Sequence, residues 1–240
     1  KHMLNHYPLY SKKLNEISDK KLLISTINAH SYNVAEEDTA FKTSLTKSDI
    51  LLPDGISIVW AHFLLTGKKI KKIAGEDLFY HEMKSLNKNK GSCFFLGSDE
   101  KTLNKIKDKT AIEFPFVEVN TYAPPFVKEF SEEENNLMIQ AINSVKPDVL
   151  FIGMTAPKQE KWAYKHFSQL NATHICSIGA VFDFYSGNRK RAPRWVVGIG
   201  VEWLYRLIIE PRRLWKRYLI GNFLFIKNIF KQRFSYKKSI

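Results

Sequence analysis

Residues 149–167, VLFIGMTAPKQEKWAYKHF, contain the pattern that decides the fold. The apolar run at 149–152 is short and uncharged, which predicts a buried strand. Residues 158–167 place apolar side chains at helical spacing among polar ones, which predicts a helix. Residues 153–159 join the two, so the stretch is the strand-loop-helix unit of an α/β protein.

The same unit recurs along the chain up to residue 188. Further strands are expected at residues 22–27, 50–52, 93–96, 116–119 and 175–178, and further helices at 34–45, 56–65, 77–86, 101–107 and 132–145. This alternation predicts a Rossmann-like, mainly parallel sheet with helices on both faces. Residues 1–188 would form this Rossmann-like domain.

The remaining residues, 189–240, have a very different charge. They contain eight Arg, all those of the chain, and six Lys against two Glu, a net of +12, whereas residues 1–188 carry +1. They also contain ten aromatic residues. Arginine binds phosphate in a forked geometry and aromatic rings favour the membrane-water boundary. We therefore expect a basic helical C-terminal appendage that contacts phosphate groups or an anionic lipid surface.

Composition limits the other possibilities. With 240 residues, 44% of them hydrophobic, the chain is expected to form one main domain plus the appendage. Cys93 and Cys176 lie in apolar runs, as reduced core thiols do, and no secretory leader is recognised, so we expect a cytosolic protein. Charged residues interrupt the apolar C-terminal runs, which excludes a spanning helix and favours a segment that lies on the inner membrane surface.

Ligands of parallel α/β sheets gather beyond the carboxyl ends of the strands. Small or polar residues follow the expected strands, and the candidate ligand contacts among them are Thr26, Asn28, Asp54, Gly97, Ser98, Tyr122, Gly153, Pro157, Lys158, Gln159 and Gly179. Asp54 could act as a general base or cap the next helix. Thr26 and Asn28 could either cap a helix or hold a ligand. The backbone N–H groups at 158–159 either face an anion or form a solvated first turn.

Several sequence signatures of other chemistries are absent. The chain has no phosphate-binding G-x-x-x-x-G-K-[ST] loop and no complete dinucleotide fingerprint. It also lacks C-x-x-C, H-E-x-x-H and Asp-x-Asp patterns, so we expect neither a metal nor a cofactor.

A set of motifs, in order along residues 22–220, resembles the WecG/TagA/CpsF family of bacterial glycosyltransferases. They are Thr26-x-Asn28, Leu52-Pro-Asp-Gly55, Gly75-x-Asp77-Leu78, Pro157-Lys-Gln-Glu160, Gly179-Ala-x-Phe-Asp-Phe184 with Gly187, Arg191-Ala-Pro193, Glu202-Trp-x-Tyr-Arg206 and Glu210-Pro-Arg-Arg213. The resemblance implies an inverting, metal-independent transfer of a sugar from a UDP-sugar to a polyprenyl-diphosphate-linked sugar. The product would serve a surface or extracellular glycopolymer, such as a teichoic acid linkage, a capsule or an enterobacterial-common-antigen-like polymer.

The resemblance also implies roles for single residues. Asp54 would deprotonate the acceptor hydroxyl, and Thr26, Asn28 and Gln159 would line the pocket around it. Lys72 stands near the place where the family has an arginine, and Thr121, beside Tyr122, stands where a glycine is expected. Lysine lacks the planar fork of arginine, so a diphosphate contact by Lys72 would be looser.

The departing UDP would need positive charge, and the basic segment offers it. Arg206, Arg213 and Arg217 are spaced by seven and four residues, which places them on one face if the helix continues past Pro211. We expect the appendage to fold over the sheet edge and deliver these arginines to the diphosphate. The alternative is a packed helix pair whose charged face is solvated.

Two other functions stay open at this stage. A pI of 9.6 is also typical of a nucleic-acid-binding protein, although charge and hydrophobic residues alternate here at helical spacing and no nucleic-acid motif occurs. A catalytically idle scaffold of a polymer-assembly complex is the other alternative. The sequence does not decide which sugar the donor carries. It also does not decide whether the protein associates with itself through faces that the appendage would otherwise cover.

Overall fold

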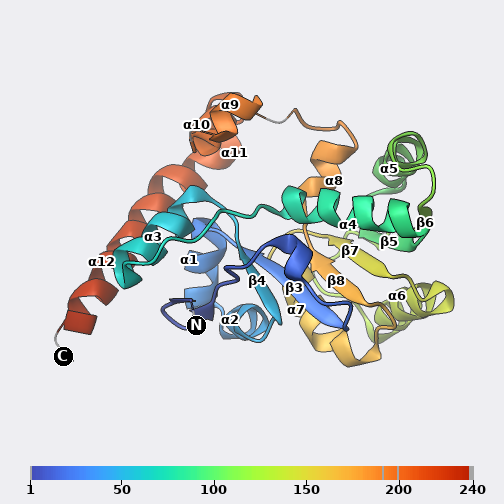
Figure 1. The fold of residues 1–240 in the computed structure, drawn as a ribbon, viewed down its shortest axis with the longest axis horizontal. Coiled ribbons are helices and arrows are strands. Elements are labelled where there is room, and N and C mark those ends of the chain that lie inside the picture. The colour runs from blue at the N-terminus through green and yellow to red at the C-terminus, as the bar shows by residue number, and fades with distance from the viewer. Residues whose placement is uncertain (1, 191, 199, 238–240) are drawn as a thin grey trace.

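The computed structural model describes residues 2–190, 192–198 and 200–237. Its centre is a six-stranded parallel sheet in the order β4-β3-β8-β7-β5-β6 (Figure 1). The strands are β3 (Leu22–Ile27), β4 (Ile50–Pro53), β5 (Ser92–Gly97), β6 (Glu118–Tyr122), β7 (Val149–Gly153) and β8 (His174–Ser177). The predicted α/β architecture is confirmed. A short antiparallel pair, β1 (Met3–Leu4) and β2 (Tyr7–Pro8), precedes it.

The helices of the body follow the predicted alternation, except that one expected helix is divided in two and that a further helix, which was not predicted, follows β8. They are α1 (Ala29–Glu37), α2 (Thr39–Thr46), α3 (Ile56–Thr66), α4 (Gly75–Asn89), α5 (Glu100–Glu113), α6 (Glu132–Val145), α7 (Lys158–His166) and α8 (Ala180–Tyr185), with short 3₁₀ turns at Leu14–Glu16 and Phe167–Gln169. The single helix expected at 34–45 is wrong, because Asp38 ends α1 and caps α2 by accepting a hydrogen bond from the Phe41 N–H at 2.9 Å. The strand expected at 116–119 lies at Glu118–Tyr122 instead, since Ser92 of β5 pairs with Glu118.

Alternate residues of the central strands face opposite layers. Phe95 and Phe151 pack with Phe79 of α4 and Phe182 of α8 in one core. Leu150 and its neighbours pack with α6 and α7 in the other. Both faces of the sheet are thus covered.

The C-terminal segment consists of α9 (Arg194–Gly198), α10 (Glu202–Ile209), α11 (Pro211–Trp215), a π-helical turn (Lys216–Ile220) and α12 (Gly221–Lys237). The helix does not continue past Pro211: α10 ends at Ile209 and α11 begins at Pro211. Because the backbone at Glu210 is not helical, with φ −125° and ψ 58°, the condition for one continuous arginine face is not met. Arg191 of the quoted motifs and residues 238–240 of the basic segment lie outside the described residues.

The long helix α12 packs along α1 and α3 of the body (Figure 1). Phe225 and Ile229 are buried in the same core as Tyr32 of α1, and the Asn33 amide donates a hydrogen bond to the Gly221 carbonyl at 2.7 Å. In the part of the chain that the structure describes, no helix combines the length and the apolarity that crossing a bilayer requires.

Candidate active site

A cavity of about 830 Å³ lies where the carboxyl ends of the strands meet the C-terminal segment. Its walls include residues that follow β3, β4, β5, β7 and β8, and residues of α10 and α11. The candidates that line it are Thr26, Asn28, Asp54, Lys72, Ser98, Gly153, Lys158, Gln159, Gly179, Arg206, Arg213 and Arg217. Acidic and basic candidates from the two parts of the chain therefore share one cavity.

Asp54 lies directly after β4, where its backbone N–H donates to the Ile27 carbonyl at 2.9 Å. The capping alternative is wrong for this residue: Gly55 is the N-cap of α3, and no side chain caps that helix. Burial raises the pKa of the Asp54 carboxyl to about 6. Repulsion from the Glu202 carboxylate adds to this rise in pKa, while the positive charge of Lys72 opposes it. Asp54 is thus a carboxyl that exchanges protons near neutral pH.

Asn28 does cap a helix. Its side-chain oxygen accepts hydrogen bonds from the N–H groups of His30 at 3.0 Å and Ser31 at 3.1 Å, which begins α1. The capping role does not remove Asn28 from the cavity wall, because the same residue lines it. Thr26 belongs to β3 and also lines the cavity. Asn28 lies beside Gly55, the residue that follows Asp54, since a Cβ placed on Gly55 would lie 3.8 Å from the Asn28 Cβ.

Gln159 and Glu160, in the first turn of α7, form a buried polar pair in the cavity wall. The Gln159 amide donates to a Glu160 carboxyl oxygen at 2.8 Å. Burial raises the pKa of Glu160 to about 7. Among the described residues, Gln159 Oε1 and Glu160 Oε2 have no hydrogen-bond partner. The absence of a side chain at Gly179 makes room for the Gln159 amide, since a Cβ there would lie 2.7 Å from Gln159 Oε1.

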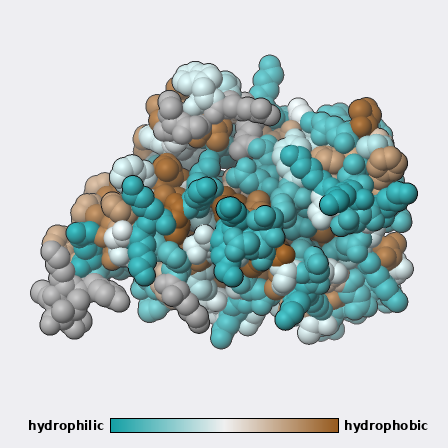
Figure 2. All heavy atoms as spheres, in the orientation of Figure 1, coloured by the Kyte–Doolittle hydropathy of each residue, from teal (hydrophilic) through white to brown (hydrophobic). Residues whose placement is uncertain are grey.

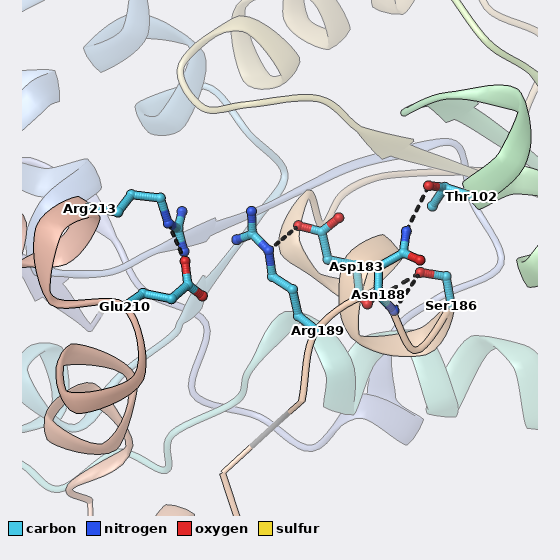
Figure 3. Close-up of polar contacts among 7 residues, drawn as sticks. All are labelled: Thr102, Asp183, Ser186, Asn188, Arg189, Glu210 and Arg213. Carbon is cyan, nitrogen blue, oxygen red and sulfur yellow. Dashed lines mark hydrogen bonds and ion pairs between the residues drawn. The ribbon is translucent and has the colours of Figure 1, made fainter.

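Arginines from α10, α11, the π-helical turn and the loop after α8 line the cavity. Figure 3 shows the two of them that pair with carboxylates, Arg213 and Arg189. Arg213 forms an ion pair with Glu210, and Arg189 forms one with Asp183 at 3.2 Å. The guanidinium groups of these two arginines are therefore bound to carboxylates of the same chain. The Arg206 guanidinium lies 5.3 Å from the centre of the Phe184 ring. Burial lowers the pKa of Arg217, and its Nε has no hydrogen-bond partner within the part of the chain described. This wall is suited to an anionic group.

Three candidates lie elsewhere. Gly97, with φ +128°, holds β5 against β7, because a Cβ there would lie 2.4 Å from the Gly153 carbonyl oxygen. Tyr122 ends β6 and packs against the core, although residues 124–128 of the following loop line the cavity. Pro157 is the N-cap of α7. Lys158 lines the cavity but donates to the Val127 carbonyl at 2.5 Å, so its charge is already engaged by that loop.

Several cavity residues were missed by the strand-end rule, among them His30, Glu160, Asp183, Arg189 and Glu202. Glu160, Asp183 and Glu202 stand inside the motifs quoted above, which was the available signal. His30 had none, since a single histidine in a helix is uninformative. Burial, and then the charge of Arg217, lowers the pKa of His30 to about 4, so the imidazole is neutral at pH 7.

Asp54, which caps no helix, and several arginines meet at the carboxyl edge of a parallel sheet. This arrangement is typical of α/β enzymes that act on anionic substrates. Comparison with known proteins makes the class specific. The family described as "Glycosyl transferase WecG/TagA/CpsF family" matches residues 9–239. The chain belongs to this family and is a glycosyltransferase, so the nucleic-acid-binding and scaffold alternatives are not retained.

Similar proteins share one name, N-acetylglucosaminyldiphosphoundecaprenol N-acetyl-beta-D-mannosaminyltransferase. The protein of Bacillus subtilis (strain 168) is 32% identical over 203 residues, which cover 84% of this chain and 77% of the relative. That of Bacillus spizizenii is 29% identical over 84% of this chain and 76% of the relative. A Staphylococcus aureus protein is 25% identical, with coverages of 87% and 80%.

Proposed function

We propose that this chain transfers a sugar, of the N-acetylmannosaminyl class, from a UDP-sugar to a polyprenyl-diphosphate-linked N-acetylglucosamine. The name that these relatives share supports both the transferred group and the acceptor. The observation that carries the proposal is the shared cavity of Asp54, Arg206, Arg213 and Arg217. A general base and a cationic wall are the two parts that such a transfer needs.

The proposed step is a single displacement. Asp54 takes the proton of the acceptor hydroxyl while that oxygen forms a bond to the anomeric carbon of the donor. The bond between the anomeric carbon and the UDP oxygen breaks on the opposite face, so the configuration inverts and UDP leaves with the electron pair. Arg206, Arg213, Arg217 and Lys72 neutralise the charge that develops on the diphosphate. Asp54 then returns its proton to water.

The proposed place of action is the inner membrane surface, to which the chain would bind peripherally. Large apolar side chains are exposed along the C-terminal segment, including Ile208, Leu219, Phe223 and Phe234. Figure 2 shows hydrophobic surface in the region of α12. Arginines and lysines lie among them, as in helices that bind anionic bilayers. A lipid-linked acceptor would be met at this surface.

The test is UDP release by the unmodified protein and by Asp54→Asn, with a panel of UDP-sugars and a short-chain polyprenyl-diphosphate-linked N-acetylglucosamine. We expect product with UDP-N-acetylmannosamine and a loss of rate of about 10²–10⁴-fold in the variant, the usual contribution of a general base. An exposed carboxylate on α5, Asp108, supplies the matched control, Asp108→Asn. An equal rate in both variants, or no transfer by the unmodified protein from any donor, would overturn the proposal.

A further inference from the structure

Helix α3 exposes a row of apolar side chains that begins at the cavity and runs away from it. Ile56, Trp60 and Phe63 are 38%, 65% and 41% exposed, whereas Ile58, Ala61 and His62 of the same helix are buried. The exposed residues are spaced by four and three, which places them on one face of the helix. Single exposed apolar residues need no explanation, but three on one stripe indicate a partner.

The stripe begins at the candidate active site. Ile56 lines the cavity and comes two residues after Asp54. A Cβ placed on Gly200, another cavity residue, would lie 3.3 Å from the Ile56 side chain, so this end of α3 adjoins the C-terminal segment. With 1.5 Å of rise per residue, the stripe extends about 10 Å along α3 from the cavity.

The other end of the stripe lies beside the segment expected at the bilayer. Helix α12 runs along α3 (Figure 1), and the Arg233 guanidinium donates to the Leu64 carbonyl. Helix α3 itself has no charged residue between Ile56 and Thr66. A chain following the stripe would therefore meet apolar side chains from the cavity to the region of α12.

We infer that Ile56, Trp60 and Phe63 bind the first isoprene units of the lipid acceptor and guide the polyprenyl chain out of the cavity. The inference rests on the proposed lipid-linked acceptor and deepens it. An acceptor whose sugar hydroxyl is at Asp54 has its diphosphate at the arginine wall, and its hydrocarbon then needs an apolar path to the membrane. Covering aromatic surface with hydrocarbon supplies the affinity.

The test uses binding, so it does not depend on sugar transfer. Geranyl, farnesyl and geranylgeranyl diphosphate, which differ by one isoprene unit each, are titrated into the full chain without detergent. We expect the affinity to rise with each unit, by several-fold per step, and the rise to flatten in Trp60→Gln/Phe63→Gln. Affinity for UDP is expected to stay unchanged. Ile112→Gln on α5, where the side chain is 82% exposed and outside the cavity wall, is the matched control.

Each result decides the inference. The same length dependence in the unmodified protein and the double variant overturns it, and so does a length-independent affinity in the unmodified protein. If the double variant loses binding to anionic-lipid vesicles but keeps the prenyl-length dependence, the stripe contacts the bilayer instead. If the double variant loses UDP binding, the single variants Trp60→Gln and Phe63→Gln replace it. Failure of the proposed sugar transfer would leave these binding results readable.

Discussion

Asp54 is the residue whose ionisation should control the reaction. Burial raises the pKa of its carboxyl to about 6, and Glu202 adds to the rise. Because a base must be ionised to accept a proton, kcat/KM for transfer should fall about tenfold per pH unit below pH 6 and level off above it. The measurement is the pH-rate profile between pH 4 and 8. A profile that stays level down to pH 5 would show that a carboxyl of ordinary pKa acts instead.

The same carboxyl should lower the stability of the folded protein at neutral pH. In the unfolded chain its pKa is near 3.8, so between pH 4 and 6 the folded state binds more protons and the free energy of unfolding falls as pH rises. Asp54→Asn lacks this pH-dependent loss of stability and should be more stable than the unmodified protein at pH 7, by about 3 kcal/mol, with little difference at pH 4.

Urea denaturation at the two pH values checks this expectation. Asp108→Asn should change the free energy of unfolding by less than about 0.5 kcal/mol, because Asp108 is exposed. A variant at Asp54 that loses both activity and stability at pH 7 would indicate a structural carboxylate rather than a base held in an unfavourable environment.

The sequence alone was sufficient to place helices and strands whose signals lie within the segment itself. The helix at Glu132–Val145 was predicted to the residue, because Ser131 and Glu134 form a capping box and Lys146 ends the helix. The break between α1 and α2 was missed, since apolar spacing continues across Asp38 while its capping bond to the Phe41 N–H ends the first helix. The start of β6 depends on its pairing with β5, which no local pattern contains.

The same limit applies to the site. The strand-end rule placed Thr26, Asp54 and Gly179 at one edge because parallel strands end together. It could not separate Gly97, which serves strand packing, from Ser98, which lines the cavity. Nor could helical spacing predict how arginines on either side of the break at Glu210 would converge, since that depends on the docking of α12 against the body.

The C-terminal helices offer a matched pair of arginines. Arg217 lines the cavity, whereas Arg212, on the preceding turn, is exposed and lies outside the cavity wall. Hydrogen bonds to charged groups contribute about 1.5–3 kcal/mol, so Arg217→Gln should weaken UDP binding by about tenfold or more. Arg212→Gln should stay within about twofold, since it removes an equal charge away from the site. Isothermal titration with UDP measures both, and equal losses would mean that net charge alone attracts the nucleotide.

For the whole molecule, the C-terminal segment is part of the fold as well as of the site. Phe225 and Ile229 are buried in the core that α1 and α3 share. Deletion of residues 189–240 would therefore expose this core, and loss of activity in such a truncation would not identify a role in catalysis or membrane binding. Point variants that separate the two faces of α12 are the sharper experiment.

Phe223 and Phe225, two residues apart on α12, supply such a pair, because they are 67% and 3% exposed. Phe225→Ala should lower the free energy of unfolding by about 3–5 kcal/mol, as expected for a buried aromatic residue. Phe223→Ala should leave stability within about 0.5 kcal/mol but reduce co-sedimentation with vesicles containing anionic lipid several-fold, since it removes an apolar contact with the bilayer. The two measurements thus test the two faces separately. Unchanged vesicle binding by Phe223→Ala, with the protein fully folded, would place the membrane contact on another face of the molecule.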